Sequence, residues 1–204
     1  MKRRLKNSIF FLCLAAILSM SACTERTDSF SINGKFVNGR TAEKAYLYTF
    51  LEEYQKVRLI DSTKVENNRF AFSGEYGESV EAFVVFDDKS SVSFILSPCD
   101  LNIVIGKNSY VVTGERDNEH LSRLMMQQHR AVNERIRLQD VYKKMQADST
   151  LTKEAEDSLL NCYRSLSVGL RKNVEATLAD STRPLLARQT RRLLSFTLAP
   201  DTIK

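Results

Sequence analysis

The chain has 204 residues, of which 43% are hydrophobic and 27% are charged, with three Pro and no Trp. This composition excludes a disordered chain, a collagen-like chain and a multi-pass membrane protein, and it leaves room for one sizeable domain or two small ones. The net charge is +5, but removing residues 1–22 changes the balance from 30 basic against 25 acidic residues to 26 against 25. The charge therefore does not indicate a nucleic-acid partner.

The first 22 residues have the pattern of an export signal. Four basic residues precede an apolar run at residues 9–18. Such a run rises about 15 Å as a helix, half of the roughly 30 Å that a bilayer core requires, so a cleaved signal is favoured over a spanning helix. Residues 19–23 (SMSAC) resemble a bacterial lipobox, although Met20 stands where Leu or Val is usual.

The lipobox resemblance implies that Cys23 becomes the lipidated first residue of the mature chain. We then expect residues 23–29 to form a polar tether and the protein to be anchored to a membrane of the cell envelope, on the periplasmic face or the cell surface. The alternative is an ordinary signal peptide cleaved near Ala22, which would leave Cys23 as a plain thiol.

Two cysteines are left once Cys13 leaves with the signal and Cys23 carries the lipid. Cys99 and Cys162 could form a disulfide or stay separate thiols, and the sequence favours separate thiols because nothing in it brings them together. The chain holds no Cys-x-x-Cys motif. Thioredoxin-type exchange needs a second thiol to resolve the mixed disulfide, so this absence counts against redox catalysis by the chain.

Residues 30–116 alternate apolar and polar side chains with a period of two. Short runs rich in Val, Ile, Phe and Tyr are separated by Gly, Asn and Asp, and they predict about eight strands. The gaps are too short for crossover helices, so we expect antiparallel pairing in a β-sandwich or meander.

Residues 117–199 change to a helical period. Asp117 and Asn118 offer N-caps for a first helix, residues 148–150 interrupt the pattern, and a second helix is predicted from about 152 to 178. A short third helix carries Pro184 in its first turn, and residues 200–204 are expected to fray. The predicted fold class is α+β: the antiparallel β domain, then a helical hairpin and the third helix.

Charge changes at the same boundary. Residues 23–118 hold 11 basic and 15 acidic side chains, whereas residues 119–204 hold 15 and 10. A basic helical half could dock on the acidic half or meet an acidic partner.

The strand region resembles a known family. The resemblance rests on F-x-I-x-G at residues 30–34, I-D-S at 60–62, F-x-F-x-G at 70–74, F-I-L-x-P at 94–98 and V-x-x-G-x-x-x-N at 111–118. These motifs are similar to the domain of unknown function 4369, found at the N-terminus of Bacteroides-group lipoproteins that continue into a thioredoxin-like, peroxiredoxin-related domain. The sequence reaches Lys204 where that domain would start, so the resemblance assigns no catalytic residue.

Few residues suggest chemistry, and we expect no cofactor, no metal site and no enzyme activity. His120 and His129 lie nine residues apart, which places them on opposite sides of one helix. The acidic pairs at residues 52–53 and 87–88 have the setting of solvated turn carboxylates. A basic set on the third helix could instead bind anions, or be an ordinary solvated face: Arg183, Arg188, Arg191 and Arg192.

The sequence thus predicts a non-catalytic envelope lipoprotein that acts as a binding or assembly module, with a membrane and an envelope protein as partners. One alternative is an accessory or truncated member of a periplasmic thiol-disulfide exchange system, which would require an exposed Cys99 of low pKa. Another is a glycan- or peptide-binding module with an exposed aromatic platform built from Tyr46, Tyr48 or Tyr54.

Overall fold

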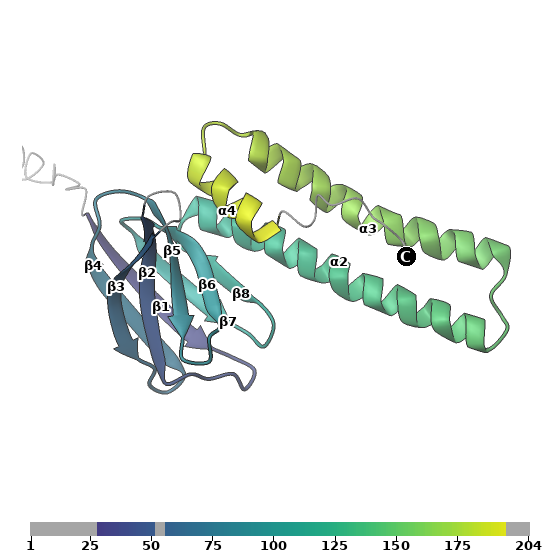
Figure 1. The fold of residues 1–204 in the computed structure, drawn as a ribbon, viewed down its shortest axis with the longest axis horizontal. Helices are drawn as coiled ribbons and strands as arrows, with labels where there is room; N and C mark the ends of the chain where they lie inside the picture. The colour runs from purple at the N-terminus through teal and green to yellow at the C-terminus, as the bar shows by residue number, and fades with distance from the viewer. Residues whose placement is uncertain (1–27, 52–55, 195–204) are drawn as a thin grey trace, which may run out of the picture.

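The computed structural model describes residues 28–51 and 56–194. The predicted signal, Cys23, nearly all of the tether and the predicted frayed tail lie outside the described residues. The part described confirms the α+β class, with eight strands followed by three helices (Figure 1). The strands are β1 (Ser29–Phe36), β2 (Lys44–Leu51), β3 (Lys56–Lys64), β4 (Arg69–Glu75), β5 (Val80–Phe86), β6 (Ser91–Leu96), β7 (Asp100–Ile105) and β8 (Tyr110–Thr113).

The strands form two four-stranded sheets, ordered β4-β1-β7-β8 and β3-β2-β5-β6. Every pair is antiparallel except β1 and β7, which run parallel with Ile32 opposite Leu101. The expectation of purely antiparallel pairing was therefore wrong at this pair. Between β1 and β7 the chain places β2, β3, β5 and β6 in the second sheet and β4 beside β1 in the first, so strands rather than a helix make the crossover.

The core lies between the two sheets and takes buried residues from every strand except β3. Phe86 has ring centroids 4.9 Å from Phe36 and 5.3 Å from Phe70, in edge-on contacts. Gly34 makes room for this cluster, because a Cβ at Gly34 would lie 2.0 Å from the Phe70 ring. The period-two pattern of the sequence thus becomes one closed apolar layer.

The first turns of the helical region close one side of this sandwich. The Asn118 side chain accepts from the Ile95 N–H at 2.8 Å and donates to the Ile95 carbonyl at 2.7 Å, which satisfies the free edge of β6. Ser122 does the same for Val112 on β8, at 2.9 and 3.0 Å. The Tyr110 hydroxyl bonds both backbone groups of Ser93 at 3.2 Å. Two edge strands are thereby blocked from pairing with another chain.

The helices are α2 (Arg116–Ala147), α3 (Lys153–Ala179) and α4 (Pro184–Leu194). The N-cap of α2 is Glu115, whose side chain accepts from the N–H groups of Asp117 and Asn118, so the prediction of Asp117 and Asn118 as caps was wrong. Asn118 instead lies one turn inside and bonds the β6 edge. Thr152 caps α3 by accepting from Ala155 N–H at 3.2 Å.

Helices α2 and α3 form an antiparallel hairpin that extends away from the β domain, and α4 packs on its near end (Figure 1). Leu186 of α4 joins Ile95 and Leu121 in one small core, and Leu194 joins Leu124, Leu170 and Val174 in another. Among the described residues, no helix is long and apolar enough to cross a bilayer.

Candidate functional site

The two thiols lie on different parts of the molecule and are not bridged. Cys99 is half-buried between β6 and β7, whereas Cys162 is exposed on α3. Burial raises the pKa of the Cys99 thiol, and the charges of Glu115 and Asp100 raise this pKa further. A thiolate is therefore disfavoured at Cys99, which is the reverse of what an exchange-active cysteine needs.

His120 and the turn carboxylate Asp87 take part in the fold, and the acidic pair at residues 52–53 lies outside the described residues. His120 Nε2 lies 2.9 Å from Thr177 Oγ1, which itself donates to the Asn173 carbonyl at 2.8 Å, so His120 is the donor. Burial lowers the pKa of His120, and the charges of Arg183 and Arg123 lower it further. Asp87 accepts from backbone N–H groups at the start of β2. The structure shows no cluster of three or more metal-ligating side chains in residues 28–51 and 56–194.

The four arginines proposed as an anion-binding face do not share one surface. Arg183 is paired with Asp117, its Nε lying 2.7 Å from a carboxylate oxygen. Arg192 donates to Gln189 at 2.6 Å and lies over the Phe50 ring at 4.2 Å, so it belongs to the contact between α4 and the sheet. Arg188 and Arg191 are exposed on α4. The helix therefore presents two solvated arginines instead of four.

The outer face of the second sheet carries the aromatic residues considered for a platform. Tyr46 and Tyr48 are half-buried there, outside the core, and Tyr54 lies outside the described residues. The ring of Tyr48 stacks on that of its cross-strand neighbour Phe83, with centroids 5.4 Å apart and planes 13° apart. One face of the Tyr48 ring is therefore covered by Phe83 and is not available for a sugar to stack on.

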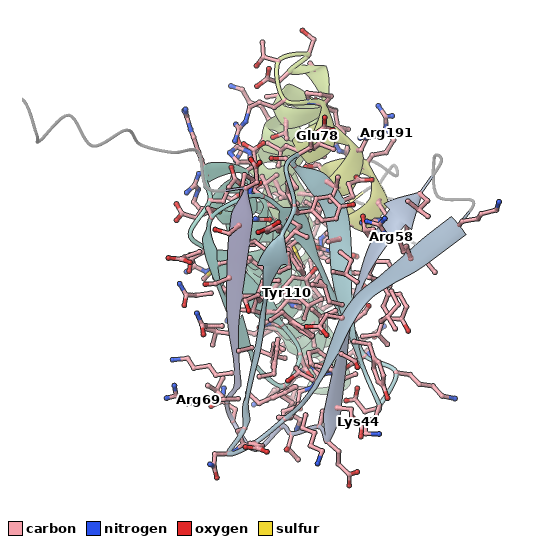
Figure 2. All side chains as sticks on the ribbon, turned by 90° about the vertical axis from the view of Figure 1, so that its left-hand side faces the viewer. Lys44, Arg58, Arg69, Glu78, Tyr110 and Arg191 are labelled. Atoms are coloured by element: carbon pink, nitrogen blue, oxygen red, sulfur yellow. The ribbon has the colours of Figure 1, made fainter. Side chains whose placement is uncertain are left out.

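Charged side chains lie around the rest of the β domain surface. Figure 2 views this domain end-on with the helices behind it, and Lys44, Arg58 and Arg69 lie around its periphery. The large apolar side chains that remain exposed on its strands belong to β3, where Val57 is 53% and Leu59 is 50% exposed.

The hairpin exposes more large apolar side chains than the β domain does. Four of the six large apolar residues found exposed in the described chain belong to it: Met126 (42%), Val132 (42%), Ile136 (52%) and Val168 (65%). The cause is its single-layer construction, because two helices bury only the stripes that face each other. In the part of the hairpin that α4 does not cover, the residues buried between α2 and α3 are Leu138 and Ser167.

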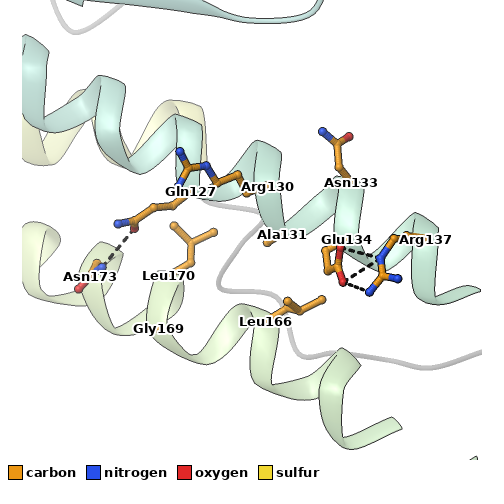
Figure 3. Close-up of a pocket in the computed structure, with 10 residues that line it drawn as sticks. All are labelled: Gln127, Arg130, Ala131, Asn133, Glu134, Arg137, Leu166, Gly169, Leu170 and Asn173. Carbon is orange, nitrogen blue, oxygen red and sulfur yellow. Dashed lines mark hydrogen bonds and ion pairs between the residues drawn. The ribbon is translucent and has the colours of Figure 1, made fainter. Parts of the chain in front are cut away.

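An open groove of about 720 Å³ runs between α2 and α3 (Figure 3). Ala131 and Gly169 lie along it, with Leu166 and Leu170 in its wall. A Cβ added at Gly169 would find nothing within 4 Å, so the fold does not require glycine at this point in the helix. We refer to this surface, lined by Gln127, Arg130, Ala131, Asn133, Glu134, Arg137, Leu166, Gly169, Leu170 and Asn173, as the hairpin groove.

One polar contact crosses the hairpin groove, and another lies beside it within α2. Asn173 Nδ2 donates to Gln127 Oε1 at 3.2 Å, and Arg137 Nε donates to Glu134 at 2.9 Å. Arg130, at the rim, makes no ion pair within the described residues, so its charge is left for solvent or a ligand.

Sequence reasoning did not single out the residues of the hairpin groove. The available signal was Gly169 inside a 27-residue helix, where glycine is less favourable than Ala by about 1 kcal/mol. The sequence does not reveal what this glycine does; the structure shows that it lies beside open space.

The solved structures that resemble this chain match less than half of it. No curated protein matches the chain. Similar solved structures include a Bacteroides ovatus protein provisionally named as a cell adhesion protein, with 10% identity, 43% of each chain covered and a TM-score of 0.29. An NMR structure of a protein from Eubacterium rectale shows 11% identity over 47% of this chain and 96% of its own, with a TM-score of 0.25. The chain thus covers less than half of the Bacteroides ovatus structure.

The family model that matches is the domain of unknown function DUF4369, over residues 30–121. The match contains all eight strands and ends in the first turns of α2, so it includes the Asn118 contact with the edge of β6. Residues 30–121, the β domain with the start of α2, thus match the DUF4369 domain.

Proposed function

We propose that the protein is a non-catalytic assembly module of the bacterial cell envelope. In this proposal a lipid on Cys23 holds the chain at a membrane, and the α2–α3 hairpin docks a protein partner. The observation that carries it is the hairpin itself, a projecting arm that exposes Val132, Ile136 and Val168 and holds an open groove.

The energetics of the arm support docking. Burial of apolar surface contributes about 25 cal/mol per Å², and half-exposed side chains gain only part of this in the free protein. In the β domain the exposed large apolar side chains are Val57 and Leu59 of β3, whereas the core between the sheets is closed and two of the edges are blocked. A partner placed on the arm would complete the burial that two helices alone cannot provide.

The site chemistry favours assembly over thiol exchange. Cys99 is half-buried and its pKa is raised. Cys162 is exposed on α3, far from Cys99 in the sequence. His120 and Asp87 are engaged in structural hydrogen bonds. These side chains therefore serve the fold of the β domain and of its junction with the helices.

Site-specific photo-cross-linking in the producing cells tests the docking role. A photoreactive residue at Val132 or Val168 should give defined protein adducts, whereas one at the exposed Ser73 of β4 should give none. Absence of adducts from the arm, or equal adducts from Ser73, would overturn the proposal. Labelling with palmitate tests the anchor separately: wild type should incorporate the label and Cys23→Ser should not, and an unlabelled wild type would remove the anchor.

A further inference from the structure

We infer that the hairpin groove receives an amphipathic α-helix of a partner protein, whose inward face is apolar and whose flank beside Arg130 is acidic. The inference rests on the proposed function and names the chemistry of the partner. It goes beyond the family match, which ends at residue 121, before the groove begins.

The shape of the groove suits a helix. From Gln127 to Arg137 the groove follows α2 for ten residues, which is about 15 Å or nearly three turns. Helices pack with their axes about 8–10 Å apart, and the closest approaches need small residues at the contact. Ala131 and Gly169 provide such residues, and the space above Gly169 is open.

Backbone hydrogen bonding also favours a helix over an extended segment. The wall of the groove consists of α2 and α3, whose backbone groups are already bonded within each helix. An extended peptide would gain no main-chain partners there, whereas a helix satisfies its own backbone groups before it docks. The same hairpin already accepts one helix, since α4 packs on its near end through Leu186 and Leu194.

The charges of the arm indicate an acidic flank on the partner helix, and they argue against a second copy of this chain as the occupant of the groove. Arg137 is neutralised by Glu134, whereas Arg130 makes no ion pair within the described chain. Residues 119–204 hold 15 basic against 10 acidic side chains, so two copies of the arm would repel each other. An acidic flank would meet Arg130 with complementary charge.

Binding of designed peptides to the full-length protein in detergent tests the inference. Two labelled helical peptides of about 20 residues share one Ala/Leu seam and differ only in having Glu or Lys along both flanks. Fluorescence anisotropy should show the Glu-flanked peptide binding about tenfold more tightly than the Lys-flanked one. Equal binding of the two, or no binding of the Glu-flanked peptide, would overturn the inference.

Substitutions then test whether the peptide binds in the hairpin groove. Gly169→Leu fills the groove and should weaken binding of the Glu-flanked peptide at least about tenfold. The matched control is Asn161→Leu, which adds the same side chain at an exposed site of α3 about 12 Å along the axis. Arg130→Glu should reverse the flank preference, whereas Arg188→Glu on α4 should leave it unchanged. Circular dichroism checks that each variant keeps its helices.

Two further results separate this inference from the proposed function. If Val132 and Val168 cross-link to a protein and Gly169→Leu leaves those adducts intact, the arm docks elsewhere and only the helix-in-groove inference fails. If sedimentation shows that the full-length protein self-associates and Gly169→Leu makes it monomeric, the occupant is a second copy and the inference fails in favour of self-assembly. Loss of the adducts with Gly169→Leu, but not with Asn161→Leu, supports both.

Discussion

The β domain and the helical arm solve the problem of burying apolar surface in different ways. The β domain closes on itself: its two sheets share one core, and Asn118, Ser122 and Tyr110 satisfy the backbone of two edge strands. The arm remains a single layer with exposed Val132, Ile136 and Val168. The domain that matches a family model therefore buries its own apolar core. The helical arm that follows it leaves apolar side chains exposed, where a partner can cover them.

The junction of the two regions explains how one chain carries both. The side chains at the start of α2 point into the β domain, where Leu121 packs with Ile95 and Leu186. Further along α2 the described element that packs on it is α3, and Val132 and Ile136 are exposed. The sandwich thus fixes the base of the arm, and the remainder is held by pairwise helix contacts.

The largest expected contrast is in the cost of removing an apolar side chain. Phe86→Ala should lower the free energy of unfolding by about 3–5 kcal/mol, because Phe86 is fully enclosed by the core between the sheets. Leu160→Ala in the arm should cost about 1 kcal/mol, because Leu160 is only half-buried and solvent fills the space. Urea unfolding of both variants measures the difference. Equal costs would show that the arm is as well packed as the sandwich.

A second contrast concerns the blocked edge. Asn118→Ala leaves the Ile95 N–H and carbonyl buried without their partner, and it should cost about 2–4 kcal/mol. The matched change in the arm is Asn173→Ala, which removes an exposed bond to Gln127 and should cost less than about 0.5 kcal/mol. Hydrogen exchange at the Ile95 amide should quicken in Asn118→Ala alone. Unchanged protection there would mean that another group covers the edge.

How far the sequence predicts this molecule differs between the same two regions. Period-two alternation located the strands, and helical periodicity located the hairpin, because both patterns are local. The parallel pairing of β1 with β7 escaped prediction because it joins residues about seventy positions apart, and nothing local marks it. Asn118 has the chemistry of an N-cap, and only the approach of β6 decides that it bonds Ile95 instead.

The candidate site escaped prediction for a related reason. The residues of the hairpin groove are small or ordinary, and a groove is a property of two helices at a given spacing and not of either sequence alone. The sequence groups Arg183 and Arg192 in one surface set. In the structure Arg183 pairs with Asp117 and Arg192 lies over the Phe50 ring, and both partners come from distant segments of the chain. Local patterns report residue types, whereas partners are set by the tertiary fold.

Glycine-to-alanine substitutions give a third contrast, because they should change the stability of the protein in opposite directions in the two regions. Gly169→Ala in the arm should stabilise the protein by about 0.5–1 kcal/mol, because helix propensity improves and the new methyl meets nothing within 4 Å. Gly34→Ala in β1 should destabilise it, because the new methyl would lie 2.0 Å from the Phe70 ring. Thermal unfolding of the two variants gives the signs directly. Destabilisation by Gly169→Ala would show that the groove is filled by the chain itself.

The smallest expected effect is a pH dependence at the base of the arm. Burial, Arg183 and Arg123 lower the pKa of His120 in the folded protein below the ordinary value of about 6.5 that it regains on unfolding. The unfolded chain therefore binds more protons in that range, and stability is lost as the pH falls from about 6.5 through the folded pKa. His120→Gln keeps a donor for Thr177 but cannot be protonated, so its urea midpoint should change less between pH 7.5 and about 5 than that of wild type. An unchanged pH dependence in His120→Gln would mean that the proton is taken up elsewhere and not at the junction of the arm with the β domain.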